Sequence, residues 1–68
     1  MEKELYYIGN DSNDRPVYKD KNGRLYVDTE PRKNKAPRIC TKYKNDFDGE
    51  PDTPKNYDFV FIPSRKTW

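Results

Sequence analysis

The chain has 68 residues, which is too short for two domains, so we treat residues 1–68 as a single small domain. Its net charge of +2 is too small to indicate a nucleic-acid partner by itself. With no histidine and a single cysteine, the sequence excludes an intramolecular disulfide and a Cys/His zinc site.

The expected core is small and aromatic. Hydrophobic residues make up 31% of the chain and aromatic residues 15%. Each buried ring removes roughly 150–250 Å² from water, so a few rings replace many aliphatic side chains. We therefore expect a folded chain, with a fold that is completed only by a partner as the alternative.

The sequence contains no candidate for a membrane anchor or a secretion signal. No apolar stretch exceeds four residues, whereas a helix that spans a bilayer needs about 20. The first residues are charged rather than apolar, as in Glu2, Lys3 and Glu4. We expect a soluble cytoplasmic protein without a membrane partner.

The first half of the chain predicts a strand and a hairpin. Residues 5–8 are rich in strand-forming side chains and end at a dense turn signal over residues 9–14. Residues 16–20 and 24–28 then flank Lys21-Asn22-Gly23. Since Asn-Gly accepts the positive φ that tight turns require, a hairpin is expected here.

The second half alternates strands with polar connections. Residues 29–37 are expected to form a long exposed loop, and residues 38–43 a further strand. Residues 45–56 contain two prolines and predict an irregular segment. Residues 57–62 are apolar on both faces, which is typical of a strand at the centre of a sheet, and residues 64–68 are expected to be a flexible tail.

The fold class follows from these elements. Six prolines are scattered along the chain, and no window of ten residues has the apolar spacing of a helix. We predict a mainly β fold with a small antiparallel sheet of four or five strands and long polar loops. A curled open barrel is the alternative to a flat meander, because it would hide the sheet edges. We expect no internal repeat.

The residues of a catalytic site are missing. No imidazole exists to activate Cys40, which we interpret as a buried strand residue, and no glycine-rich phosphate loop is present. The acidic run over residues 46–52 has the wrong spacing for an EF-hand, because Pro51 and Tyr57 take the places of the required Gly and Glu. We expect no enzyme, no cofactor and no metal site, and we interpret the acidic run as a solvated loop.

The expected function of the chain is therefore to bind another macromolecule. Rings and basic side chains alternate along the predicted strands, as in β domains that stack single-stranded nucleic acid. The acidic run and the small net charge oppose phosphate binding, whereas tyrosine, tryptophan and open sheet edges suit protein partners. We predict a non-catalytic protein-interaction module, with a single-stranded nucleic-acid-binding domain as the alternative. The candidate binding residues are Tyr18, Tyr26, Lys42, Tyr43 and Trp68.

Two stretches of the chain, Arg15 to Tyr26 and Asn45 to Pro54, carry a resemblance to a known group of proteins. Residues 5–62 resemble a poorly characterised small domain found in proteins of mobile elements and gut Firmicutes, including large polyvalent proteins of phages and conjugative elements. The resemblance implies a bacterial accessory module inside the cell, and it implies that the acidic loop is a shaped feature. It brings no activity and no catalytic residue.

Overall fold

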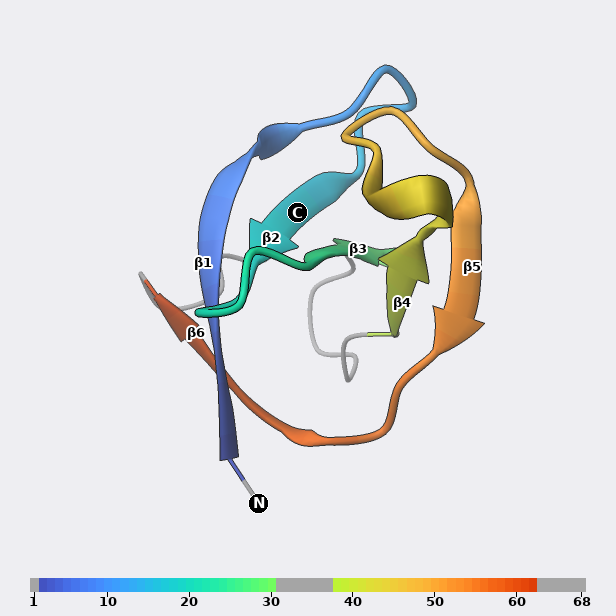
Figure 1. The fold of residues 1–68 in the computed structure, drawn as a ribbon. Helices are drawn as coiled ribbons and strands as arrows, with labels where there is room; N and C mark the ends of the chain where they lie inside the picture. Colours follow the sequence, from blue (N-terminus) through green and yellow to red (C-terminus); the bar gives the residue numbers. More distant parts are fainter. Residues whose placement is uncertain (1, 31–37, 63–68) are drawn as a thin grey trace.

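The computed structural model describes residues 2–30 and 38–62, which form one curled sheet (Figure 1). The sheet is open, it is not closed into a barrel, and its strand order is β5-β4-β3-β2-β1-β6. A short 3-10 turn, η1, covers Tyr43–Asn45. The strands are β1 (Glu2–Asn10), β2 (Pro16–Lys19), β3 (Leu25–Asp28), β4 (Ile39–Lys42), β5 (Pro51–Pro54) and β6 (Asp58–Ile62).

The mainly β fold is confirmed, including the hairpin formed by β2 and β3 around Gly23. The strand count is larger than the predicted four or five, because β5 forms inside the segment that we expected to be irregular. Its prolines, Pro51 and Pro54, are compatible with a strand since β5 lies at one edge of the sheet. The sheet is also not wholly antiparallel, because β6 pairs with β1 in parallel.

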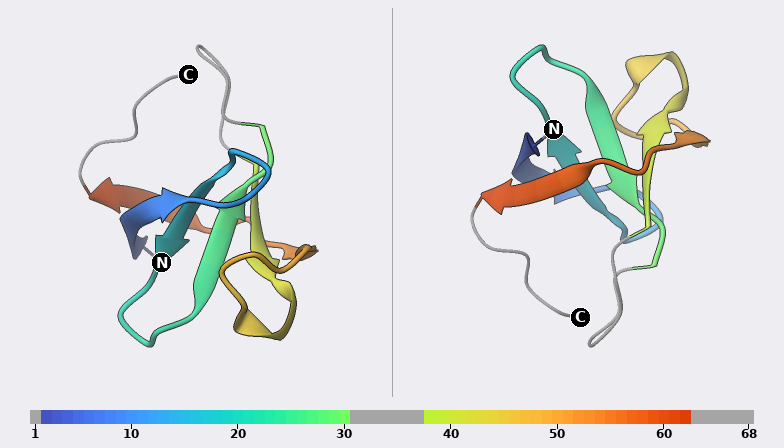
Figure 2. Two further views of the ribbon diagram at one scale, coloured as in Figure 1. Left: turned by 90° about the horizontal axis from the view of Figure 1, so that it is seen from above. Right: turned by 90° about the horizontal axis from the view of Figure 1, so that it is seen from below.

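The prediction that residues 57–62 form a central strand is wrong. β6 lies at the edge of the sheet opposite β5 (Figure 2). Only one of its two apolar faces is directed at the core. Phe59 and Phe61 pack on the core, while Val60 points the other way and is 38% exposed. The strong curl of the sheet lets an edge strand bury one face in this way.

One five-residue turn joins β1 to β2 and again joins β2 to β3. In each copy the aspartate Oδ1 accepts the backbone N–H groups two and four residues later, and the aspartate N–H donates to the arginine carbonyl. The two copies share the pattern Asp-x-Asn-x-Arg, at residues 11–15 and 20–24. The prediction of no internal repeat therefore overlooked this repeated turn. The shared Asp-x-Asn-x-Arg pattern is visible in the sequence.

The two copies differ at their fourth residue, which has positive φ in both. This residue is Asp14 in the first turn, with φ of 60°, and Gly23 in the second, with φ of 84°. A type I turn followed by one left-handed residue is a common connection for hairpins. In the second turn Gly23, of the Asn22-Gly23 pair that predicts the hairpin, is the left-handed residue. In the first turn Asp14 takes this conformation, which aspartate tolerates better than most other residues do.

The core is aromatic, as the composition predicts. Leu5, Tyr18, Tyr26 and Ile39 form a buried cluster on one face of the sheet, and Phe59 and Phe61 pack against it. The ring centroids of Tyr18 and Phe61 are 5.0 Å apart. Within residues 2–30 and 38–62, no helix has the length and apolar character needed to cross a bilayer.

The opposite face of the central strands is also covered. Val17 and Val27 pair across β2 and β3 and are completely buried. The loop after η1 folds back toward them, and the Phe47 ring approaches β1 so closely that a Cβ added to Gly9 would lie 3.5 Å from it. The sheet therefore buries both faces at its centre, which leaves the ends of the curl and the edge strands for contact with other molecules.

Candidate functional site

The structure separates the five predicted binding residues. Tyr18 is 1% exposed, and Tyr26 and Lys42 are each 2% exposed, so none of the three presents a free surface to a partner. The curl of the sheet turns both rings into the core, which corrects the idea that rings and cations share an exposed face. Tyr43 follows β4 and is exposed, with the Lys44 ammonium 5.5 Å from the centre of its ring. Trp68 lies outside the described residues.

Lys42 closes one end of the curled sheet. Its Nζ donates to Asp11 Oδ2 over 2.6 Å and to the Gly49 carbonyl over 3.1 Å, and both charged side chains are buried. Burial acts to raise the pKa of Asp11, but hydrogen bonds from Lys42 and from the backbone of the turn lower it overall. Such a pair, built from residues 31 positions apart, fastens the first turn to β4 and needs no ligand.

Hydrogen bonds also fasten η1 and the acidic loop that follows it. Asp48 accepts a hydrogen bond from the backbone N–H of Ser12, and Asn45 bonds both the Gly23 carbonyl and the Leu25 N–H. These contacts tie the loop to both repeated turns. Within the described ranges, no group of three potential ligands is placed to hold a metal ion. The contacts give the loop a structural role.

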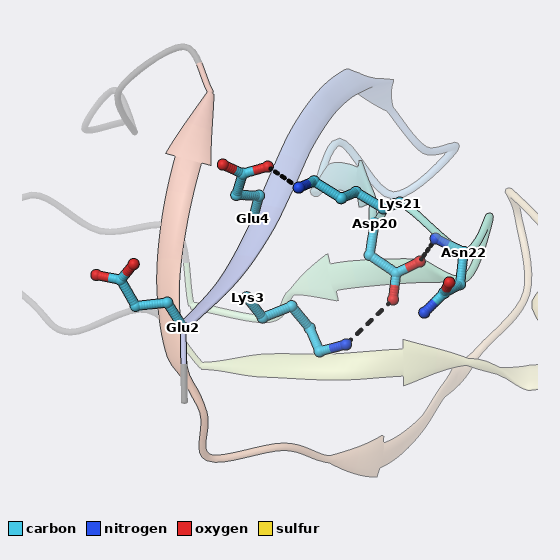
Figure 3. Close-up of a pocket in the computed structure, with 6 residues that line it drawn as sticks. All are labelled: Glu2, Lys3, Glu4, Asp20, Lys21 and Asn22. Carbon is cyan, nitrogen blue, oxygen red and sulfur yellow. Dashed lines mark hydrogen bonds and ion pairs between the residues drawn. The ribbon is translucent and has the colours of Figure 1, made fainter.

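At the other end, which we call the open end because two hollows adjoin it, Asp20 lies beside Lys3 and Asn22 (Figure 3). Asp20 Oδ1 accepts the two backbone bonds of the second turn, while Oδ2 accepts from Tyr26 Oη over 3.1 Å and from Lys3 Nζ over 3.4 Å. Burial acts to raise the pKa of this carboxyl, but the four hydrogen bonds lower it overall. Burial and the bond to Asp20 raise the pKa of Tyr26 to about 12.

Two adjoining hollows open around this carboxylate. The first, of about 320 Å³, is the one drawn in Figure 3 and lies between β1 and the second turn. The second, of about 450 Å³, reaches across to β4, β5 and the β5–β6 connection. Lys3, Asp20 and Asn22 line both. The second is also lined by Arg24, Tyr26, Thr41, Asp52, Thr53, Lys55 and Tyr57.

The two edges of the sheet have opposite character. β5 has proline at both ends, at Pro51 and Pro54, and proline has no N–H to offer an added strand. β6 contains no proline from Asp58 to Ile62, and within the described part of the chain its outer side pairs with no strand. Among the described residues, β5 therefore offers fewer backbone donors to an added strand, whereas the outer side of β6 has no paired strand.

Apolar side chains lie beside the open edge. Val60 is exposed on β6, and in the parallel register Tyr6 of β1 lies next to Ile62. Tyr6 and Ile8 are exposed as well. Sequence analysis did not predict an open edge at β6, because it placed residues 57–62 inside the sheet.

No family model, curated protein or solved structure matches the chain. The resemblance to a small domain of mobile-element proteins therefore stays an expectation from the sequence, and the site is interpreted on its own geometry.

Proposed function

We propose that this chain is a non-catalytic interaction module that binds an extended segment of another protein as an added strand on β6. The observation that supports this most is the contrast between the two edges: β5 carries two prolines, and β6 carries none. Proteins commonly protect exposed edges with proline, charge or a covering segment. An edge strand that carries apolar side chains and contains no proline suits strand addition. The cytoplasmic location expected from the sequence is part of the proposal.

The side chains of β6 give such a strand two kinds of contact. Val60 projects from the outer face of the sheet and is paired with Glu4 of β1, while the exposed Tyr6 lies two residues further along, next to Ile62. Phe59 and Phe61 project from the inner face and are only partly buried. A partner strand with apolar residues at alternate positions would extend one apolar face, beside Phe59 and Phe61 or beside Val60, and its backbone would pair with the edge.

The nucleic-acid alternative lacks the surface that it needs. Its proposed stacking residues, Tyr18 and Tyr26, are in the core, and Lys42 is paired with Asp11. Tyr43 is exposed, but its only described ring contact is with the neighbouring Lys44. We therefore keep this function as an outcome of the tests and not as a second proposal.

The test begins with random dodecapeptides displayed on phage and selected against the immobilised chain. Selected peptides are expected to alternate apolar and polar residues. Titrated into the ¹⁵N-labelled chain, they should cause their largest amide shifts at residues 58–62. Peptides that shift residues 51–54 or the loops instead, or a selection that yields no binder, would contradict the proposal.

Two variants at one position make the test sharper. Val60→Lys places a charge on the open edge, which opposes pairing, whereas Val60→Thr keeps a β-branched side chain. Val60→Lys is expected to weaken peptide binding about tenfold or more, which corresponds to about 1.4 kcal/mol. Val60→Thr should bind within about threefold of the original chain, a difference of less than 1 kcal/mol. Equal binding by both variants would show that the peptide binds elsewhere.

A further inference from the structure

We propose that the larger hollow at the open end is a binding site for a small oxyanion, a carboxylate or phosphate group. It is lined by side chains from six parts of the fold, with Lys3 on its β1 side. Three of its side chains are cationic: Lys3, Arg24 and Lys55. This site is separate from the outer edge of β6, so it goes beyond the proposed function.

Lys3 is held in position by the groups around it. Its Nζ lies 3.4 Å from Asp20 Oδ2, 5.5 Å from the Tyr57 ring centre and 6.0 Å from the Tyr26 ring centre. A carboxylate and two ring faces thus fix the ammonium, while its side chain remains 26% exposed. An ammonium has three donors, and the described contacts of Lys3 with protein oxygens use one. The remaining donors are available to an anion.

Arg24 and Lys55 supply further positive charge to the hollow. Within the described residues, neither side chain forms an ion pair, although both line the same hollow as Lys3. Lys42 and Lys21, in contrast, are paired with Asp11 and Glu4. Two further cations beside one fixed ammonium create a locally positive hollow that favours an anion.

Two carboxylates also line the hollow, and they have different effects. Asp20 accepts four hydrogen bonds, one of them from Lys3, so its charge is largely compensated. Asp52 has no ion-pair partner among the described residues and opposes an anion. Three positive and two negative side chains leave the lining with a charge of +1. Asp52 therefore weakens the site without reversing its sign.

A cationic ligand fits the hollow less well. The space over the Tyr26 and Tyr57 rings, where a cation would be stabilised, already holds the Lys3 ammonium. A second cation would have to displace Lys3 and would meet Arg24 and Lys55. The three cationic side chains of the hollow therefore repel a cationic ligand.

The test titrates the ¹⁵N-labelled chain with inorganic phosphate and, separately, with N-acetylglutamate, at constant ionic strength. Amide shifts are expected at residues 3, 22, 24, 55 and 57, with saturation in the millimolar range for whichever anion class the site accepts. Saturation by phosphate alone, by the carboxylate alone or by both identifies that class. Absence of saturable shifts at these residues with both probes would overturn the proposal.

Matched variants separate a site from general attraction. Arg24→Gln and Lys55→Gln should each weaken anion binding about two- to fivefold, the size expected for an exposed ion pair. Asp52→Asn should strengthen it by a similar factor. Lys44→Gln and Glu50→Gln make the same charge changes outside the lining and should have no effect. If the control variants match the lining variants, the binding is non-specific and the proposal fails.

A last arm uses oligothymidylate as the probe. Shifts at the lining residues that Arg24→Gln reduces would identify nucleic-acid phosphate as a source of the oxyanion. Shifts confined to Tyr43 and Lys44 at lower concentration than either small anion would instead place the anion site outside the hollow, which would contradict the proposal.

Discussion

The two repeated turns have the same backbone and opposite surroundings. Asp11 and Asp20 each accept two N–H groups of their own turn through Oδ1, and each meets a lysine from another strand through Oδ2. At the first turn that lysine is Lys42, completely buried and 2.6 Å away. At the second it is Lys3, partly exposed and 3.4 Å away.

The difference shows how one local motif serves two purposes. At the closed end, the acidic loop covers the carboxylate and its lysine, so the pair fastens the fold. At the open end, the Asp20 carboxylate is also buried, but its lysine remains 26% exposed and lines two hollows. Local sequence sets the turn, and the residues packed around it decide whether the lysine partner of its aspartate is buried or accessible.

The largest expected effect is on the closed end. Lys42→Met keeps the aliphatic stem but leaves the buried Asp11 carboxylate with Arg15 as its remaining ion-pair partner, which costs up to about 3–5 kcal/mol. Lys3→Met removes a partly exposed pair and should cost about 1 kcal/mol or less. Urea denaturation measures both. Similar costs for the two variants would remove the distinction between the ends.

Acidification should have the next largest effect. The folded-state pKa values of Asp11 and Asp20 are lowered, so their contribution to stability is fully present above the ordinary aspartate pKa of about 3.9. It is lost as the pH falls through the lowered values. Asp11→Asn should remove more of this pH dependence than Asp20→Asn, as measured by urea midpoints between neutral and acidic pH. The reverse order would contradict the comparison.

The smallest expected effect concerns the left-handed residue of each turn. Gly23→Ala should cost about 1 kcal/mol, because φ is 84° while the nearest atom to the new Cβ, on Lys19, is 4.0 Å away and leaves room. Asp14→Gly should change stability by less than about 0.5 kcal/mol, since glycine also accepts this conformation. Thermal unfolding distinguishes the two. A neutral Gly23→Ala would show that the turn relaxes out of the left-handed region.

Sequence reasoning identified the elements that depend on neighbouring residues. The hairpin around Asn22-Gly23 is correct because its turn chemistry is local. Residues 39–42 form a strand as expected, although Tyr43 leaves it for the 3-10 turn. The prolines of β5 indicated an irregular segment, but an edge strand tolerates them.

The errors arose where distant segments meet. The curl of the sheet, which alternation alone does not show, decides that Tyr26 and Tyr18 are buried. Lys42 looked like a free cation since its partner, Asp11, is 31 residues away. β6 looked central because both of its faces are apolar, whereas its parallel pairing with β1 places it at an edge. The open hollow depends on the same long-range pairings.

Native-state hydrogen exchange tests the contrast between the closed and open ends most directly. The N–H groups of Asn13 and Arg15 bond Asp11, and those of Asn22 and Arg24 bond Asp20, in equivalent geometry. After correction for intrinsic rates, the first pair should exchange more slowly, because opening that turn also exposes the buried Lys42 pair. Equal protection of the two turns, or stronger protection at Asn22 and Arg24, would contradict this account.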